Sequence, residues 1–138
     1  TPMLKGASNI AFVENITYDA EVNQCQGFTY NSKKNVFVLA CINSEGTNQI
    51  LYELNPDTFE KVGTYKFTDS ERLGHCNTMT YNRYTNKIYL TNGLKNGNNL
   101  TVINADTMAI ENTITLQEKV FNIDYDYKDL CIHCTYRR

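Results

Sequence analysis

Apolar and polar residues alternate along most of this chain in short stretches that polar turns separate. Residues 27–30 and Lys61–Phe67 alternate with period two, which is typical of strands with one buried face. Val36–Ile42 is apolar throughout, and this predicts a strand that is buried on both faces. No stretch shows the period of an amphipathic helix. The pattern therefore predicts an all-β fold.

One sequence pattern recurs along the chain. Residues 26–35 (QGFTYNSKKN) return 51 positions later as residues 77–86 (NTMTYNRYTN). Residues 54–58 (LNPDT) return 49 positions later as residues 103–107 (INADT). A third and shorter copy begins near Val120, 44 residues after the second copy. Internal repetition with such a period is typical of repeat folds and propellers.

Each of the two full copies predicts four short antiparallel strands. The expected ranges are 27–30, 36–42, 49–55 and 61–67 in the first copy, and 78–81, 87–91, 99–104 and 111–116 in the second. Four such strands in about 45 residues are typical of one blade of a β-propeller. We therefore expect the all-β fold to be built of propeller blades.

The length of 138 residues leaves the expected propeller incomplete. We expect a single propeller segment over residues 1–138, with blades at 24–68 and 75–117 and a partial blade at 119–138. Residues 1–23 are expected to form an N-terminal arm or a strand of a preceding blade. A propeller ring closes with about four to eight blades, and this chain supplies about two and a half. A longer gene product, other copies of the chain or a partner chain would have to complete the ring.

Composition and charge exclude some classes of function. The chain has 13 Lys and Arg against 15 Asp and Glu, a net charge of −2, and no basic face for phosphate contacts. We therefore expect no nucleic-acid partner. No apolar run approaches the roughly 18 residues of a membrane helix, and no secretory signal pattern is visible. We expect no membrane insertion.

The cysteines are odd in number and irregularly spaced, which predicts free thiols: Cys25, Cys41, Cys76, Cys131 and Cys134. Cys131 and Cys134 resemble a metal-binding pair at first. Residues three apart in a strand point to opposite faces, however, so we expect packed thiols there and no metal site. Cys25 and Cys76 occupy equivalent repeat positions, which favours a shared packing role. No cofactor is expected.

The candidate ligand-binding residues lie where the chain crosses from one blade to the next. His75 and Asn77 precede an innermost strand of the second copy, and Gln24, Gln26 and Lys119 hold equivalent or neighbouring places in the other copies. Such crossings form the rim of the central channel, where propellers place ligands. A polar ring there would suit a hydroxyl-rich or phosphate-bearing ligand. Alternatively, His75 stabilises its own loop, and both interpretations stay open.

Other residues receive structural interpretations. His133 aligns with Leu39 and Leu90 in an apolar strand, so we expect a packed, neutral imidazole. Asp57 and Asp106 lie in hairpin turns, where an Asp side chain bonds the backbone two residues on, which argues against catalysis.

The tyrosines at one repeat position are Tyr30, Tyr81 and Tyr125, and the repetition predicts that they belong to the core.

Residues 26–40 (QGFTYNSKKNVFVLA) and 74–92 (GHCNTMTYNRYTNKIYLTN) resemble the blade signature of a group of bacterial and bacteriophage five-bladed propellers. The group includes tail receptor-binding proteins of phages that infect Gram-positive bacteria, and related helveticin and teichoic-acid-associated proteins. The resemblance covers residues 24 to about 134. It implies a host-surface glycopolymer ligand such as wall teichoic acid, with Gln26, His75 and Asn77 near the channel mouth. The sequence departs from the group in carrying only about half of the expected blades.

We therefore expect a non-enzymatic binding module of a phage tail, located in the virion or outside the cell, that recognises a cell-surface glycopolymer. One alternative is a propeller-fold hydrolase or lyase that acts on sugars or phosphodiesters. The other is a structural blade segment in a larger virion assembly.

Overall fold

The computed structural model describes residues 16–93 and 97–136, and all regular secondary structure in these residues is β-strand. The strands are β1 (Gln24–Asn31), β2 (Val36–Ile42), β3 (Gln49–Leu54), β4 (Lys61–Phe67), β5 (Met79–Asn82), β6 (Lys87–Thr91), β7 (Asn99–Asn104), β8 (Ile110–Thr115), β9 (Val120–Asp126) and β10 (Cys131–Tyr136). These bounds agree with the predicted strands to within a few residues. In the part of the chain that the structure describes, no helix could cross a membrane.

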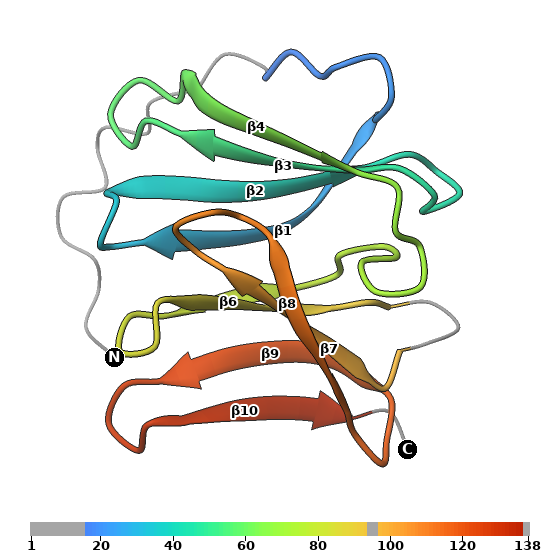
Figure 1. Cartoon of the computed structure of the whole chain (residues 1–138), viewed down its shortest axis with the longest axis vertical. Helices are drawn as coiled ribbons and strands as arrows, with labels where there is room; N and C mark the ends of the chain where they lie inside the picture. Colours follow the sequence, from blue (N-terminus) through green and yellow to red (C-terminus); the bar gives the residue numbers. More distant parts are fainter. Residues whose placement is uncertain (1–15, 94–96, 137–138) are drawn as a thin grey trace, which may run out of the picture.

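The strands form three antiparallel sheets in chain order (Figure 1). The first blade has the order β1-β2-β3-β4, the second has the order β5-β6-β7-β8, and β9 pairs with β10 in a third, two-stranded sheet. Every pairing joins strands that follow each other in sequence, because short polar turns link them. This is the meander that the repeat predicts for each blade.

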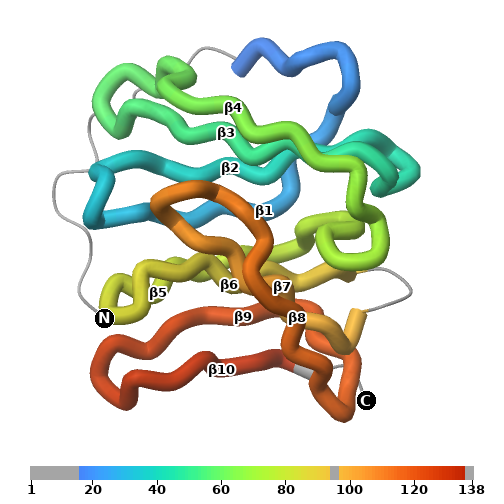
Figure 2. Tube along the Cα trace, in the orientation of Figure 1, coloured from blue at the N-terminus to red at the C-terminus, as the bar shows by residue number. Residues whose placement is uncertain are grey.

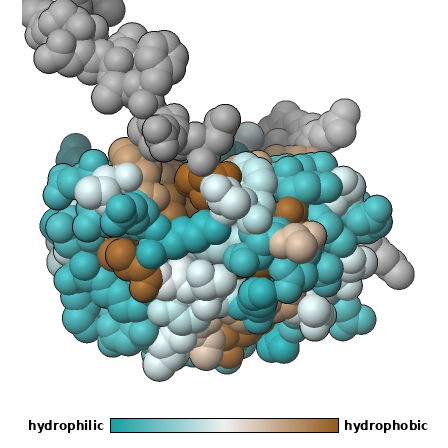
Figure 3. All heavy atoms as spheres, turned by 90° about the horizontal axis from the view of Figure 1, so that it is seen from above, coloured by the Kyte–Doolittle hydropathy of each residue, from teal (hydrophilic) through white to brown (hydrophobic). Residues whose placement is uncertain are grey.

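The sheets stack so that the first strand of each lies next to the first strand of its neighbour. β1 contacts β5, and β5 contacts β9, and Figure 2 shows the three sheets one below the other. The largest core cluster lies between the first and second blades, where Val38 and Ala40 of β2 meet Tyr81 and Ile88. A smaller cluster around Leu100 joins the second blade to the third. Seen from above, the surface is mostly hydrophilic, with separate apolar patches (Figure 3).

The expected strand or arm before the first blade lies largely outside the described residues. Of this segment, Ile16 and Val22 pack against the outer face of the first blade, beside Leu39 and Tyr52. Residues 16–23 have no strand pairing.

The repeated tyrosine faces the preceding sheet wherever the structure has one. Tyr81 and Tyr125 are buried against the blade before them, as predicted. The prediction is wrong for Tyr30, which is 42% exposed. Tyr30 belongs to the outer face of the first blade, where it packs edge-on against Phe37 instead of entering a core between two blades.

The expectation of a packed His133 is also wrong, because its side chain is 63% exposed. In the observed register Tyr81 pairs with Ile88 and Tyr125 pairs with Ile132. His133 is therefore the counterpart of Tyr89, one position away from the Leu90 of the sequence alignment. A shift of one residue in a strand moves a side chain to the opposite face.

The two cysteines at equivalent repeat positions do not share a packing role. Cys76 is fully buried, whereas Cys25 is exposed and lies 3.6 Å, sulfur to sulfur, from Cys41. The hydroxyl of Tyr18 lies 2.9 Å from the Cys25 sulfur. None of the five cysteines forms a disulfide, and burial raises the pKa of the Cys41 thiol.

Candidate ligand-binding site

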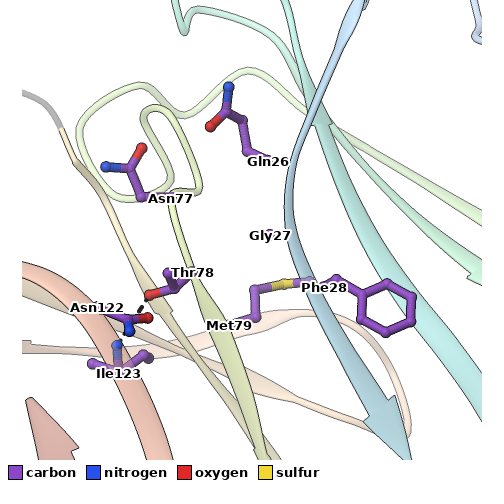
Figure 4. Close-up of a pocket in the computed structure, with 8 residues that line it drawn as sticks. All are labelled: Gln26, Gly27, Phe28, Asn77, Thr78, Met79, Asn122 and Ile123. Atoms are coloured by element: carbon purple, nitrogen blue, oxygen red, sulfur yellow. Dashed lines mark hydrogen bonds between the residues drawn. The ribbon is translucent and has the colours of Figure 1, made fainter.

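An open hollow of about 330 Å³ lies between the innermost strands of the three sheets. Its lining comes from the same repeat positions in each sheet, at the start of β1, β5 and β9. The hollow therefore follows from the stacking of the repeat. The lining residues are Gln26, Gly27, Phe28, Asn77, Thr78, Met79, Asn122 and Ile123 (Figure 4).

Two carboxamide side chains, Gln26 and Asn77, occupy the same end of the hollow (Figure 4). The Nε2 of Gln26 lies 3.5 Å from Oε1 of Gln24, whose own Nε2 donates to the hydroxyl of Ser44 at 3.2 Å. Gln24 thus positions Gln26 without lining the hollow itself. Carboxamides both donate and accept hydrogen bonds, which is the pairing that a sugar hydroxyl requires.

The absence of a side chain at Gly93 leaves the space that the Asn77 side chain occupies. Gly93 has φ of +72°, and a Cβ atom there would lie 2.3 Å from Cγ of Asn77. Neither the backbone angle nor the space would accept a larger residue without movement. The main chain adds a further contact, since the backbone N–H of Asn77 donates to the carbonyl of Thr91 at 3.1 Å.

Gly27 brings the first blade close to the second at the floor of the hollow. A Cβ atom at this position would lie 2.8 Å from the carbonyl oxygen of Cys76 and 2.9 Å from Cγ of Met79. The corresponding positions in the other sheets carry Thr78 and Asn122, which supply a hydroxyl and a carboxamide to the hollow. The same repeat position therefore serves close packing in one blade and polar lining in the others.

Thr78 and Thr80 connect the second blade to the third. The Oγ1 of Thr78 accepts the backbone N–H of Ile123 at 3.2 Å, and the Oγ1 of Thr80 accepts that of Tyr125 at 3.0 Å. These N–H groups lie on the inner edge of β9, which has no neighbouring strand in its own sheet. Side-chain oxygens of β5 thus satisfy the edge of β9 and hold the wall of the hollow in place.

His75 belongs to the crossing loop that both blades clamp. Buried Gln49 donates through Nε2 to the carbonyl of Gly74 at 3.1 Å and accepts the N–H of Asp69 at 3.1 Å. From the second blade, Asn92 donates to the carbonyl of Glu71 at 2.8 Å and accepts the backbone N–H of His75 at the same distance. The half-buried His75 side chain is not among the lining residues of the hollow.

The structure thus brings Gln26 and Asn77 together and places Gln24 beside them, while His75 and Lys119 lie outside the lining. Lys119 is exposed in the turn before β9. Sequence reasoning missed Thr78 and Asn122. The repeat itself could have found both, because they occupy the position after Gln26 in the other copies.

Among the described residues, the most buried carboxylate lies in the first blade, outside the lining of the hollow. Glu53 is 4% exposed, and its carboxylate accepts a hydrogen bond from Lys34 at 3.1 Å and one from the Tyr65 hydroxyl at 2.5 Å. The bond to Glu53 raises the pKa of Tyr65 to about 12. Lys34 also donates to the carbonyl of Asp106 in the second blade at 2.9 Å. This carboxylate therefore joins two blades through a satisfied ion pair.

The Asp-Thr turns contain a different side-chain bond from the expected one. The oxygen that bonds the backbone belongs to Asn55 and Asn104, each two residues before the Asp. Asn55 Oδ1 accepts the N–H of Asp57 at 2.8 Å, and Asn104 Oδ1 accepts that of Asp106 at 2.9 Å. These are Asx turns, which close the hairpins.

No protein-family profile and no curated protein matches the sequence. Among solved structures, the chain is similar to hydrazine synthase of Kuenenia stuttgartiensis, with a TM-score of 0.59 and 9% identity over 91% of this chain and 33% of that one. It is similar to Hsv2 of Kluyveromyces marxianus, with a TM-score of 0.51 and 11% identity over 83% of this chain and 31% of that one. It is also similar to Hsv2 of Kluyveromyces lactis, with a TM-score of 0.50 and 11% identity over 82% of this chain and 30% of that one.

These similar structures are β-propellers. The likeness confirms the all-β propeller fold with part of the ring present. The chain spans about a third of the length of each of these proteins.

Proposed function

We propose that this chain is a non-enzymatic binding module of a phage tail, and that its hollow binds the hydroxyl groups of a host cell-surface glycopolymer such as wall teichoic acid. The convergence of Gln26, Asn77 and Asn122 from three sheets on one hollow supports the proposal most strongly. Carboxamides arranged around a channel suit neighbouring sugar hydroxyls, which also donate and accept. The propeller fold is compatible with this role and with others, so the argument rests on the site.

The chemistry of the lining favours hydroxyl groups over phosphates as the part of the polymer that is recognised. None of the lining residues is charged, and a phosphate site would need Lys or Arg side chains. Phe28 lies at the edge of the hollow, but its ring points away from the other lining residues and packs against Phe37 on the outer face of the first blade (Figure 4). Each contact is weak, and several copies of the module on one particle would strengthen binding through multivalency.

We further propose that blades of a partner chain extend this lining around the rest of the ring. A site that uses one polar residue from each blade gains contacts with each added blade. The proposed partner is therefore part of the binding site as well as of the fold.

Calorimetric titration with purified wall teichoic acid tests the proposal. Gln26→Ala and Asn77→Ala should each weaken binding about tenfold, the effect of losing one or two hydrogen bonds. Gln117→Ala and Asn112→Ala, which remove exposed carboxamides outside the hollow, should bind like the parent chain.

Three results would overturn the proposal. One is equal binding by all four variants, and another is the absence of binding by the parent chain, which would favour a structural blade segment. The third is cleavage of the polymer, seen as new reducing ends or phosphomonoesters, which would identify a hydrolase or lyase.

A further inference from the structure

The turn between β9 and β10 gathers oxygen, nitrogen and sulfur donors on the exposed face of the third sheet. Ligand atoms of Asp126, Asp129 and His133 all lie within 4.8 Å of one another. Cys131 adds a thiol whose Sγ lies 3.5 Å from Nε2 of His133. Zinc accepts this mixture of carboxylate, imidazole and thiolate ligands.

Strand pairing explains why these side chains meet. Cys131 pairs directly with Asp126 across the hairpin, and His133 lies two residues further along β10, on the same face. Cys134 points to the opposite face, where it packs in the core against the second blade. The donors therefore come from across the hairpin, and Cys131 and Cys134 point to opposite faces, as their spacing in a strand predicts.

The turn orients Asp126 toward His133. Its Oδ1 accepts the backbone N–H groups of Lys128 at 2.8 Å and Asp129 at 3.2 Å. Its Oδ2 then lies 3.2 Å from Nε2 of His133. The hydrogen bonds from the Asp129 and Lys128 backbones lower the pKa of the Asp126 carboxyl, so that it is ionised at neutral pH.

Two donor atoms converge on one imidazole nitrogen. Nε2 of His133 lies near both Oδ2 of Asp126 and Sγ of Cys131, but an imidazole nitrogen has a single in-plane direction for a hydrogen bond. The Cys131 sulfur does not lie within 4.8 Å of all the other ligand atoms, so its side chain would have to turn toward an ion held by Asp126, Asp129 and His133. Tetrahedral zinc holds an imidazole nitrogen about 3.3 Å from a carboxylate oxygen and about 3.5 Å from a thiolate sulfur. The observed distances of 3.2 Å and 3.5 Å are close to these values.

The other two hairpins carry different residues at the same positions. Asp126 replaces an Asn, Cys131 replaces a Val or Lys, and His133 replaces a Val or Tyr. On the first blade this face packs into the core through Val36 and Val38, whereas the His133 side chain is 63% exposed. An ion can therefore reach the group from solvent. The counterparts are Asn31 and Asn82, Val36 and Lys87, and Val38 and Tyr89.

We propose that Asp126, Asp129, Cys131 and His133 form a zinc-binding site. On binding, the Cys131 thiol loses its proton to solvent and its thiolate bonds to the ion, together with Nε2 of His133 and one oxygen from each Asp. The ion would fasten the turn to β10 and stabilise the hairpin.

Titration of the reduced, tag-free chain with zinc chloride tests this site. Calorimetry should show one zinc ion per chain. Asp126→Asn keeps the turn, since Asn is present in the other hairpins, and should weaken zinc binding at least about tenfold, as should His133→Ala. Cobalt chloride should give a thiolate-to-cobalt absorption band that Cys131→Ser abolishes.

Cys134→Ser and Cys25→Ser are the controls, because these thiols lie on the opposite face and in the first blade. Both variants should bind zinc like the parent chain. Failure of the parent chain to bind zinc would overturn the site. So would binding that survives Asp126→Asn and His133→Ala, or binding that is lost in Cys25→Ser.

Discussion

At the scale of single residues, one device closes each β-hairpin between the first two strands of a sheet. A side-chain oxygen accepts backbone N–H groups two and three residues ahead, and the residue is Asn31, Asn82 or Asp126. The turn then ends in a left-handed residue. The φ angles there are 53° at Asn35, 54° at Asn86 and 54° at Leu130.

Leu130→Asn should raise the free energy of unfolding by about 1 kcal/mol, because the left-handed conformation costs an ordinary L-residue about 1–2 kcal/mol and Asn tolerates it. Leu130 is 60% exposed, so its replacement gives up little apolar burial. Urea unfolding measures the change. The reverse variant, Asn86→Leu, should destabilise the chain by more, since it also removes the acceptor of the Tyr81 hydroxyl. Equal stability of Leu130→Asn and the parent chain would contradict this explanation.

At the scale of elements, side chains join neighbouring sheets where no strand pairing does. Thr78 and Thr80 of β5 accept N–H groups of β9, and Gln49 and Asn92 clamp the crossing loop between the first two blades. Both devices use buried polar atoms whose hydrogen bonds are satisfied, and such groups fix one arrangement of the sheets.

Thr80→Val should destabilise the chain by about 1–3 kcal/mol, because it leaves the buried N–H of Tyr125 without its acceptor. Hydrogen exchange should show faster exchange of the Tyr125 amide. Thr64→Val on the outermost strand of the first blade is the matched control, since Thr64 is exposed, and it should change little. Unchanged exchange at Tyr125 would mean that the threonine does not hold β9.

An ion pair in the second blade predicts that the stability of the fold depends on pH in the acid range. The carboxylate of Glu111 on β8 accepts from Asn104 at 2.8 Å and pairs with Lys87 at 3.0 Å, and these bonds lower its pKa below the ordinary 4.5. A lowered folded pKa stabilises the fold above pH 4.5, and this contribution is lost as the pH falls through the folded value. Glu111→Gln should reduce stability at neutral pH and flatten the fall below pH 4.5 in denaturant titrations.

Lys87→Gln provides the control for this ion pair. If the ion pair between Glu111 and Lys87 causes the loss of stability, the two substitutions should not add. The double variant Lys87→Gln/Glu111→Gln should then be at least as stable as the less stable of the two single variants. Additive losses would show that Glu111 and Lys87 act separately.

At the scale of the whole molecule, the two end faces of the stack differ in chemistry among the described residues. The outer face of the first blade carries a cluster of aromatic rings around Phe37. The outer face of the third sheet carries Asp124, Asp126 and His133. Packing one against the other in a second copy would bury charges opposite aromatic rings, which is unfavourable.

We therefore expect this chain on its own to be monomeric. Light scattering at micromolar concentration should give a mass of 15.8 kDa. A closed oligomer of this chain would contradict the expectation.

The repeat made most of the fold predictable. Asn-rich turns mark strand ends, so that ranges such as Val36–Ile42 agree with the structure. The face of the strand on which each side chain lies was less predictable. A shift of one residue in the alignment placed His133 on the wrong face, and burial of Tyr30 depends on the neighbouring sheet. Among the site residues, Gln26 and Asn77 follow from the repeat. The place of His75 depends on hydrogen bonds from Gln49, which is distant in sequence.

NMR titration of the ¹⁵N-labelled chain with purified wall teichoic acid is the most direct test of ligand binding between the innermost strands. The side-chain amide signals of Gln26, Asn77 and Asn122 should shift as the polymer is added, and those of Asn112 and Gln117 should stay in place. Unchanged signals from the hollow at saturating polymer, or shifts confined to other surfaces, would contradict a glycopolymer site between β1, β5 and β9.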